Sequence, residues 1–150
     1  MINMVAKKIV LKGHKGIGGV VEGEALVSKD PLSYMSDVGG VWDEPMTAVL
    51  TNKKSLPDWY GKSLANKVLV FPTGKGGIFS PQIIIDLTKH NLGPKAMVNI
   101  RTHPVFALAA ILANIPTVQG FDKNPIEVIE TGDWVKVDAP KGIVEVTKKK

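Results

Sequence analysis

The sequence predicts a mixed α/β domain with barrel-like sheets and helices on one side. Predicted strands outnumber predicted helices, at least two helices fall between strands, and both ends of the chain are rich in strands. No internal repeat or low-complexity stretch divides the chain. Its 150 residues fit one domain, 1–150, which is large enough to bury most of its surface around a core.

Glycines separate the apolar runs of the first segment. Residues 9–11, 20–21 and 25–27 predict two short strands around a glycine-rich turn. The glycines miss the dinucleotide-binding fingerprint, because Val21 stands where the third glycine is required. We therefore favour a hairpin with bulges over a ligand-binding loop in this segment.

Residues 30–63 read as a long irregular connection, which contains three prolines and several glycines. Long connections in compact domains tend to be functional or mobile. The aromatic residues Trp42, Trp59 and Tyr60 in this segment either cover an edge of the core or face a partner chain. We favour a partner surface, because aromatic side chains on loops are common at interfaces.

The remaining elements are clearer from their apolar runs and turn signals. Ser80 and Pro81 form a good pair of N-cap and first helical residue, and a glycine and a proline stop the same helix after Asn91. The predicted elements are, in order, a strand at 68–71, a helix at 82–91, a strand at 96–100, an apolar helix at 105–113 that Pro104 begins, a strand from 115 to 118, a short helical or extended segment at 125–130, and strands at 134–138 and 142–146.

The stretch "VFPTGKGGIFSPQIIIDL" places a glycine loop between a buried strand and a helix. This order is how proteins build anion sites from backbone N–H groups. Lys75 is a candidate anion contact or base, with a solvated surface lysine as the alternative. The loop is not a nucleotide-binding P-loop, because Gly76 follows Lys75 where serine or threonine is required and Val70 stands at the first glycine position.

The absence of cysteine excludes several kinds of chemistry. The chain forms no disulfide and has no thiolate nucleophile, no cysteine-ligated zinc and no iron–sulfur cluster of its own. His14, His90 and His103 lie far apart without the spacing of metal ligands, so we expect no metal site within this chain.

Charge and hydropathy limit the partners that we expect. The net charge is +5, but the chain has a single arginine and its aromatics do not alternate with lysines, which argues against nucleic-acid binding. Mild basicity suits an anionic partner or substrate. No apolar run approaches the roughly 18 residues of a membrane span, and no signal-peptide pattern is seen, so we expect a cytoplasmic protein without a membrane partner.

Several stretches in order resemble the small, swivelling subunit of the aconitase X family. His14 stands where the family often has arginine, and Trp42 is inserted before Asp43. One such stretch would be weak evidence, but their order along nearly the whole chain is fairly specific. The stretches are "LKGHKGIGGVVEGEALVS", "PLSYMSDVGGVWDEP", "YGKSLANKVLVFPTGKGG", "ANIPTV" and "IETGDWVKVDAPKGIVEV".

The resemblance implies a swivelling β/β/α domain that closes over a larger subunit. Members of the family are hydro-lyases: archaeal ones dehydrate mevalonate 5-phosphate, and bacterial relatives act on cis-3-hydroxy-L-proline. It further implies an iron–sulfur cluster in the large partner subunit, whose open iron would act as Lewis acid on the leaving hydroxyl. This chain would bind no cofactor alone and would supply a base and contacts to a small anionic substrate.

The resemblance also names site residues. The family loop is typically Gly-x-Gly-Ser-Ser, with one serine as the proton-abstracting base, but Gly77 and Ile78 stand at the two serine positions here. Ser80 is the candidate replacement, with a role as helix N-cap as the alternative. The expected catalytic residues are Ser80 and Lys75, and the expected substrate-binding residues are Gly74, Lys75, Gly76, Gly77, Gly39, Gly40 and His14.

Three hypotheses therefore follow from the sequence. The leading one is the small subunit of an iron–sulfur dehydratase that acts on mevalonate 5-phosphate or a hydroxyproline. The second is a divergent binding or assembly module that keeps the fold and lacks the loop serines. The third is a phosphohistidine carrier, for which His14 between two glycines is the candidate residue.

Overall fold

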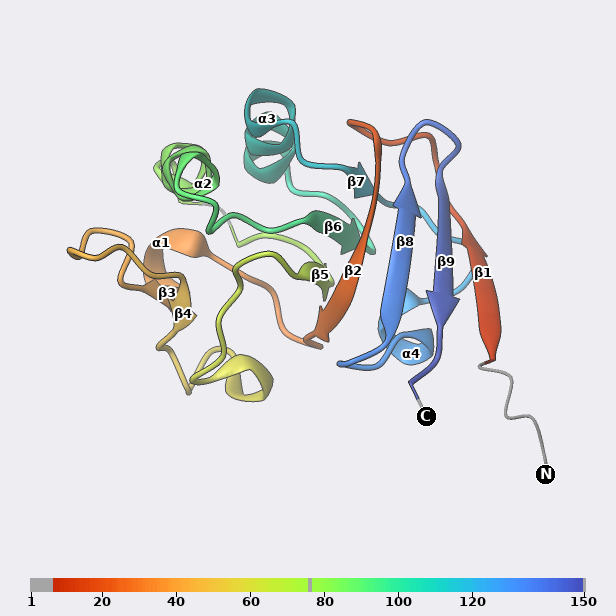
Figure 1. Cartoon of the computed structure of the whole chain (residues 1–150), viewed down its shortest axis with the longest axis horizontal. Helices are drawn as coiled ribbons and strands as arrows, with labels where there is room; N and C mark the ends of the chain where they lie inside the picture. The colour runs from red at the N-terminus through yellow and green to blue at the C-terminus, as the bar shows by residue number, and fades with distance from the viewer. Residues whose placement is uncertain (1–6, 76, 150) are drawn as a thin grey trace.

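The computed structural model describes residues 7–75 and 77–149. Within these residues, the strands form one seven-stranded sheet in the order β1-β9-β8-β2-β5-β6-β7 and a two-stranded sheet of β3 and β4 (Figure 1). The strands are β1 (Lys8–Lys12), β2 (Val20–Val27), β3 (Val38–Gly39), β4 (Val49–Leu50), β5 (Val68–Phe71), β6 (Ala96–Asn99), β7 (Thr117–Val118), β8 (Trp134–Asp138) and β9 (Ile143–Thr147). The helices are α1 (Tyr34–Asp37), α2 (Ser80–Lys89), α3 (Pro104–Ala113), α4 (Pro125–Val128) and a 3-10 helix, η1 (Pro57–Trp59).

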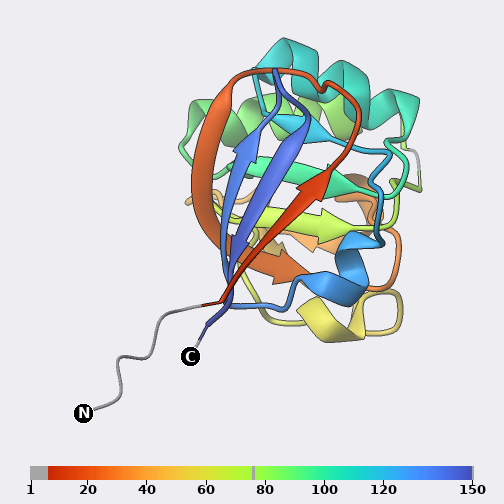
Figure 2. The same cartoon turned by 90° about the vertical axis from the view of Figure 1, so that its right-hand side faces the viewer.

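The strand β2 joins an antiparallel half of the sheet to a parallel half. Its first part, 20–24, pairs with β8 in the antiparallel sense, whereas 25–27 pair with β5 in the parallel sense. Figure 2 shows β2 sweeping in an arc from one set of strands to the other. Gly23 lies just before the change of partner, where a strand must bend and glycine is common.

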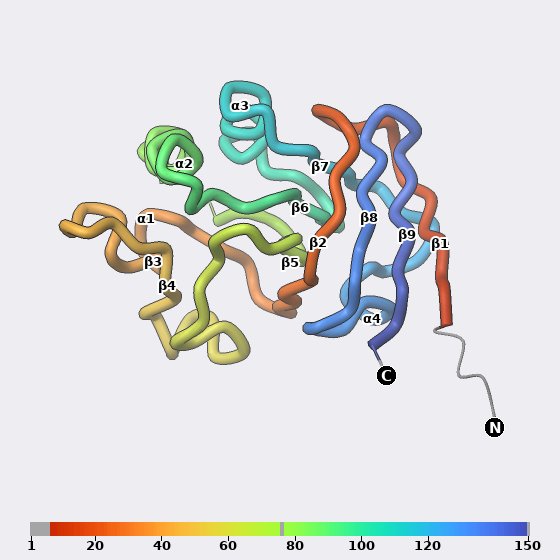
Figure 3. The backbone as a smooth tube through the Cα atoms, viewed as in Figure 1, coloured from red at the N-terminus to blue at the C-terminus, as the bar shows by residue number. Residues whose placement is uncertain are grey.

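The predicted hairpin between the first two strands is wrong. Strand β1 pairs with β9 and β2 pairs with β8, so the hairpin of β8 and β9 lies between them. The connection 13–19 is an arch (Figure 3) that hydrogen-bonds to distant backbone. The N–H groups of Gly13 and Gly16 donate to Gly142 and Ala139 at 2.7 and 2.8 Å. A Cβ on Gly16 would lie 2.0 Å from a backbone oxygen, so these glycines serve close packing.

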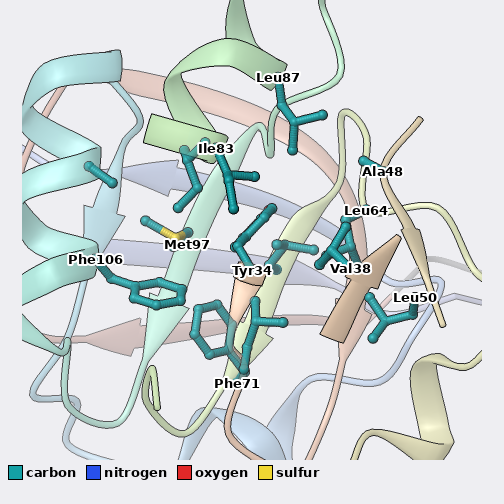
Figure 4. Close-up of a cluster of buried hydrophobic side chains, with 14 of the residues drawn as sticks. Tyr34, Val38, Ala48, Leu50, Leu64, Phe71, Ile83, Leu87, Met97 and Phe106 are labelled. Atoms are coloured by element: carbon teal, nitrogen blue, oxygen red, sulfur yellow. The ribbon is translucent and has the colours of Figure 1, made fainter. Parts of the chain in front are cut away.

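Two hydrophobic cores lie on opposite faces of the parallel strands. Every residue of β5 and β6 is buried, as parallel strands covered on both faces require. Leu69, Phe71 and Met97 belong to the core under α2 and α3 (Figure 4). The alternate residues Val68 and Val98 belong to the core shared with the antiparallel strands. The prediction of barrel-like sheets with helices on one side is therefore confirmed.

The segment 30–63 is more ordered than the sequence predicts, since it forms α1, β3, β4 and η1. Trp59 is fully buried and its ring lies edge-on to Phe71, with 6.0 Å between ring centroids. The prediction that it faces a partner is therefore wrong. Trp42 and Tyr60 are 73% and 52% exposed, and a partner surface at these two residues stays a prediction.

The helices α2 and α3 pack side by side but differ in their outer faces. The outer positions of α2 include the polar residues Gln82 and Lys89. In contrast, α3 contains no charged residue and exposes Leu108, Ile111 and Leu112, which share one face at helical spacing. Within the described residues, no helix is long and apolar enough to span a membrane.

A buried carboxylate ties the last strand to the turn before β8. Asp133 accepts hydrogen bonds from the Lys148 ammonium at 2.6 Å and from the backbone N–H groups of Glu130 and Lys149 at 2.8 and 3.0 Å. Burial raises the pKa of Asp133. The hydrogen bonds and the charge of Lys148 lower it by more, so the pKa lies below the ordinary value of 3.8.

This depressed pKa predicts a loss of stability in acid. A carboxylate with a lower pKa in the folded state stabilises the fold above about pH 4, and the contribution is lost as the pH falls through the folded pKa. Asp133→Asn should lower the free energy of unfolding at pH 7 by about 1.5–3 kcal/mol and flatten its dependence between pH 5 and pH 2. Urea unfolding at several pH values measures both, with the exposed Asp58→Asn as control. An unchanged slope in Asp133→Asn would contradict the prediction.

Candidate functional site

A pocket of about 410 Å³ opens at the carboxyl ends of the parallel strands β5 and β6. Both strands point to the same edge of the molecule (Figure 2), so the loops that follow them meet there. Small-molecule sites commonly have this size and position. The pocket is lined by Pro72, Thr73, Gly74, Ile100, Arg101, Thr102, His103 and Pro104.

Backbone hydrogen bonds hold the two loops together. The N–H groups of Ile100 and Arg101 both donate to the carbonyl of Pro72, at 3.1 Å each. The buried Asn99 donates from its side chain to the carbonyl of Phe71 at 3.1 Å, which continues the pairing past the end of the strand. The pocket walls are therefore fixed to the sheet and do not depend on a long free loop.

Gly74 allows the glycine loop to approach α3 closely. A Cβ at this position would lie 2.5 Å from the ring of Phe106 and 3.1 Å from the Cβ of His103. His103 caps α3, because its Nδ1 accepts a hydrogen bond from the N–H of Val105 at 3.1 Å. Gly74 therefore lines the pocket, and its contact with a substrate stays a prediction. Its neighbour Gly76 lies outside the described residues.

Lys75 points its charge toward the segment 30–63, and it does not line the pocket. Its ammonium lies 3.1 Å from the carboxylate of Asp37 and also hydrogen-bonds the hydroxyl of Ser55. Asp37 is fully buried and accepts further hydrogen bonds from Ser33 N–H at 2.8 Å and Asn52 Nδ2 at 2.9 Å. The ion pair therefore anchors the glycine loop to α1.

Gly77 and Ser80 lie in direct contact at the start of α2. Gly77 has a φ of +94°, and a Cβ added to it would lie 3.0 Å from the Ser80 hydroxyl and 3.4 Å from that of Ser33. Ser80 is fully buried and is the first residue of α2, while Phe79 occupies the N-cap position. The alternative prediction, that Ser80 is the helix N-cap, is therefore wrong, because the N-cap is one residue earlier, at Phe79.

Gly39 and Gly40 serve packing in the described structure. A Cβ on Gly39 would lie 2.5 Å from the side chain of Thr51, and one on Gly40 would lie 1.7 Å from that of Thr47. These two glycines let β3 and the residues after it lie close to the chain around β4. They do not line the pocket.

His14 lies in the arch, away from the lining of the pocket. Its imidazole lies against Gly120, where an added Cβ would come within 2.6 Å of the ring. Gly120 lines a second pocket of about 270 Å³, which shares Ile100 with the first. The structure therefore brings His14 to the same region as the glycine loop without joining the two in one cavity.

Sequence reasoning missed the residues that line the pocket after β6. Arg101, Thr102 and His103 form a polar run directly after a buried parallel strand. The carboxyl ends of neighbouring parallel strands share an edge, so this run next to the glycine loop was a usable signal. Within residues 7–75 and 77–149, no cluster of three or more His, Cys, Asp or Glu side chains is arranged to hold a metal ion.

The anchoring of the loop by Asp37 predicts an asymmetric effect of two substitutions. Asp37→Asn should lower the free energy of unfolding by about 1.5–3 kcal/mol, because an NH2 group replaces one of two buried oxygens that both accept hydrogen bonds, and the charge that pairs with Lys75 is lost. Lys75→Met should cost only about 1 kcal/mol or less, since its ammonium is partly solvated and Asp37 keeps its other donors. Urea unfolding measures both, with the exposed Asp43→Asn as control. A larger loss in Lys75→Met than in Asp37→Asn would contradict this arrangement.

Comparison with known proteins extends over almost all of the chain. Residues 10–146 match the family described as the aconitase X swivel domain. The phosphomevalonate dehydratase small subunit of Methanocella arvoryzae is 41% identical over 137 residues, which cover 91% of this chain and 98% of that protein. The protein of the same name from Thermococcus kodakarensis is 42% identical over 136 residues, covering 91% and 95%.

Solved structures agree with the sequence comparison. The crystal structure of Thermococcus kodakaraensis aconitase X in its holo-form superposes with a TM-score of 0.81 at 39% identity and covers 93% of this chain and 99% of that one. The solution NMR structure of a UPF0107 protein gives a TM-score of 0.76 at 32% identity, with 92% and 99% coverage. Family, relatives and fold coincide over the same residues, and the chain belongs to the aconitase X swivel-domain family.

Proposed function

We propose that this chain is the small subunit of a phosphomevalonate dehydratase. The observation that carries the proposal is the nearly end-to-end match to small subunits of that name, at 41% identity over 98% of the Methanocella protein. The pocket at the carboxyl ends of β5 and β6 supports it, since it offers a site for a small molecule beside the glycine loop. The substrate is then mevalonate 5-phosphate, an anionic hydroxy acid that suits the net charge of +5.

The reaction removes water from two neighbouring carbons of the substrate. A base takes the proton next to the carboxylate, the hydroxyl on the adjacent carbon leaves, and a carbon–carbon double bond forms between them. This chain would contribute the base and part of the binding site. Proton transfer by a positioned side chain typically contributes 10²–10⁴-fold to the rate.

The residues of this chain do not fit an iron–sulfur cluster. The sequence contains no cysteine, and the described residues contain no group of three or more histidine and acidic side chains arranged to hold a metal. We therefore assign the cluster, whose iron supplies a Lewis acid for the leaving hydroxyl, to the large subunit. We derive no step of this chain through it.

Exposed apolar side chains around the glycine loop support a large subunit that covers the site. Met35, Ile78 and Phe79 are 53%, 82% and 53% exposed, and the Cβ of Met35 lies 3.4 Å from the position of a Cβ on Gly77. These residues do not line the pocket, and large exposed apolar groups that lie together are typical of a surface that another protein covers. We place the complex in the cytoplasm, where its phosphorylated substrate is retained by charge.

The loop itself favours a second candidate, a binding or assembly module without the dehydratase base. Gly77 and Ile78 carry no hydroxyl, and the ammonium of Lys75 is paired with Asp37. The hydroxyls of Ser80 and Ser33 lie close to Gly77, but Ser80, the candidate base, is buried beneath that residue. For Ser80 to reach a substrate, the loop at Gly77 must shift when the two subunits close.

The proposal predicts activity only when both subunits are present. Co-expression with an aconitase X-type large subunit should give a complex that dehydrates mevalonate 5-phosphate, with at least 100-fold lower kcat/KM for cis-3-hydroxy-L-proline. Each subunit alone is the control. A purified complex with a fully loaded cluster that consumes neither compound would overturn the dehydratase proposal and leave the assembly module.

Substitutions in the loop then identify the base. Ser80→Ala should lower kcat of the complex about 100-fold or more with little change in KM, if Ser80 moves the proton. Ser63→Ala, at an exposed serine away from the loop, is the matched control. Full activity in Ser80→Ala would reject this assignment.

Restoring a loop hydroxyl is a separate test of the binding or assembly module. The backbone conformation at residues 77 and 78 determines which of the two positions accepts serine. Ile78 is 82% exposed and accepts serine, whereas Gly77 has a φ of +94° that costs an L residue about 1–2 kcal/mol. If the chain has lost only its base, Ile78→Ser should raise kcat at least tenfold over Ile78→Ala, and Gly77→Ser should not. An equal kcat in Ile78→Ser and Ile78→Ala would exclude simple loss of the base.

A further inference from the structure

We propose that Arg101 binds the phosphate group of the substrate in the pocket between the two loops. The inference rests on the proposed function for the identity of the substrate. It adds a charged contact to the phosphate, beyond the backbone N–H groups that the sequence analysis expects from the glycine loop. It also sets the direction in which the substrate lies.

The guanidinium of Arg101 is exposed and uncommitted at the wall of the pocket. Its backbone is fixed, because its N–H donates to Pro72 at 3.1 Å and the next N–H, of Thr102, donates to Gln119 Oε1 at 2.6 Å. Throughout the described ranges 7–75 and 77–149, the side chain of Arg101 takes part in no ion pair or hydrogen bond with the protein. The position is thus rigid while the charged group is available to a ligand.

Two lysines form ion pairs with buried carboxylates of the same chain. Lys75 is paired with Asp37, and Lys148 is paired with Asp133. Among the residues that line the pocket, which contain no Asp or Glu, Arg101 is the permanently charged cation. A ligand anion in the pocket would therefore meet a positive charge without a competing carboxylate in the wall.

The shape and chemistry of the walls suit a short carbon chain with a phosphate at one end. Pro72, Ile100 and Pro104 give apolar surface, and Thr73 and Thr102 add hydroxyls. The planar fork of arginine binds two phosphate oxygens at once, which a lysine does not do. We do not assign the phosphate to the N-terminus of α3, because the N–H of Val105 already donates to His103 Nδ1.

The position of Arg101 relative to the glycine loop orients the substrate. Gly74 and Arg101 line the same pocket, and Gly77 follows Gly74 by three residues along the loop toward α2. A phosphate held at Arg101 leaves the hydroxy-acid end to extend along the loop toward Gly77 and Ser80. The reacting carbons then lie on the side of Met35, Ile78 and Phe79, the exposed apolar residues that we expect the large subunit to cover.

Kinetics of the assembled complex test the proposal. Arg101→Ala should raise KM for mevalonate 5-phosphate about 10- to 100-fold, as expected for loss of a charged hydrogen-bonded contact, with kcat changed less than about threefold. Arg101→Lys should restore part of the loss. The matched control is Lys123→Ala, which removes a cation from the neighbouring pocket. Because the Arg101 side chain has no protein partner, the thermal midpoint should not change.

The selectivity for the phosphate separates a phosphate contact from a general effect. The ratio of kcat/KM for mevalonate 5-phosphate to that for mevalonate should fall at least tenfold in Arg101→Ala. An unchanged ratio in an active complex would overturn the inference while the proposed function stands.

Binding of inorganic phosphate to the full chain alone gives a readout independent of dehydratase activity. Phosphate should shift the amide NMR signals of Thr73, Gly74 and Thr102, and these shifts should vanish in Arg101→Ala but persist in Lys123→Ala. Shifts that depend on Arg101 in a chain whose complex is inactive would support the anion subsite and reject the dehydratase. Shifts that are identical in wild type and Arg101→Ala would reject the subsite.

Discussion

The double pairing of β2 is the constraint on which the rest of this structure depends. One end of the strand hydrogen-bonds to β8 and the other to β5, so a single strand belongs to an antiparallel and a parallel array. The bend folds one array over the other, and the side chains of β5 and β6 then have core on both faces. The strand interiors are thus filled by apolar side chains, and the pocket opens where the strands end and the two loops meet.

The distribution of charge follows from the same arrangement. A buried carboxylate is costly unless hydrogen-bond donors or a cation surround it, and Asp37 and Asp133 each have several donors as well as a lysine. These pairs fix segments of chain to the sheet, but their charges are no longer available to bind ligands. Among the described residues, Arg101 forms no such ion pair, so its charge remains available to the ligand that we propose for the pocket. Lys75 and Lys148 thus serve the structure, whereas the anion contact that we propose uses the unpaired Arg101.

Much of the fold could be predicted from local patterns in the sequence. The apolar runs at 68–71 and 96–100 predict buried strands, and the structure has β5 and β6 there. The apolar helix predicted to begin with Pro104 and to run over 105–113 is also present, as α3, and His103 caps it. The prediction of a hairpin between the first two strands is wrong because β1 and β2 pair with β9 and β8, more than 100 residues away in the sequence. A local sequence pattern does not reveal such distant pairing.

The candidate site was harder to predict for a similar reason. The glycine loop was visible as a loop, but the partner of Lys75 comes from a segment that the sequence analysis described as irregular. The burial of Ser80 depends on packing of the loop against α1, which spacing along the chain does not reveal. Arg101 was not predicted as a site residue, because it follows a different strand from the glycine loop and lies more than 20 residues away from that loop in the sequence. Parallel pairing of β5 and β6 was the missing step, since it turns two separate stretches into one edge.

The pairing of β1 with β9 has a consequence for the order in which the chain can fold. Strands β5, β6 and β7 and the helices between them are contiguous in sequence, so their contacts form early and close short loops. The pairing of β1 must wait for residues 143–147, which leave the ribosome last in this stretch. Until then both edges of the first strand lack partners, and an unpaired edge can pair with another chain. The pairing that completes this end of the sheet is thus a long-range closure between the two ends of the described chain.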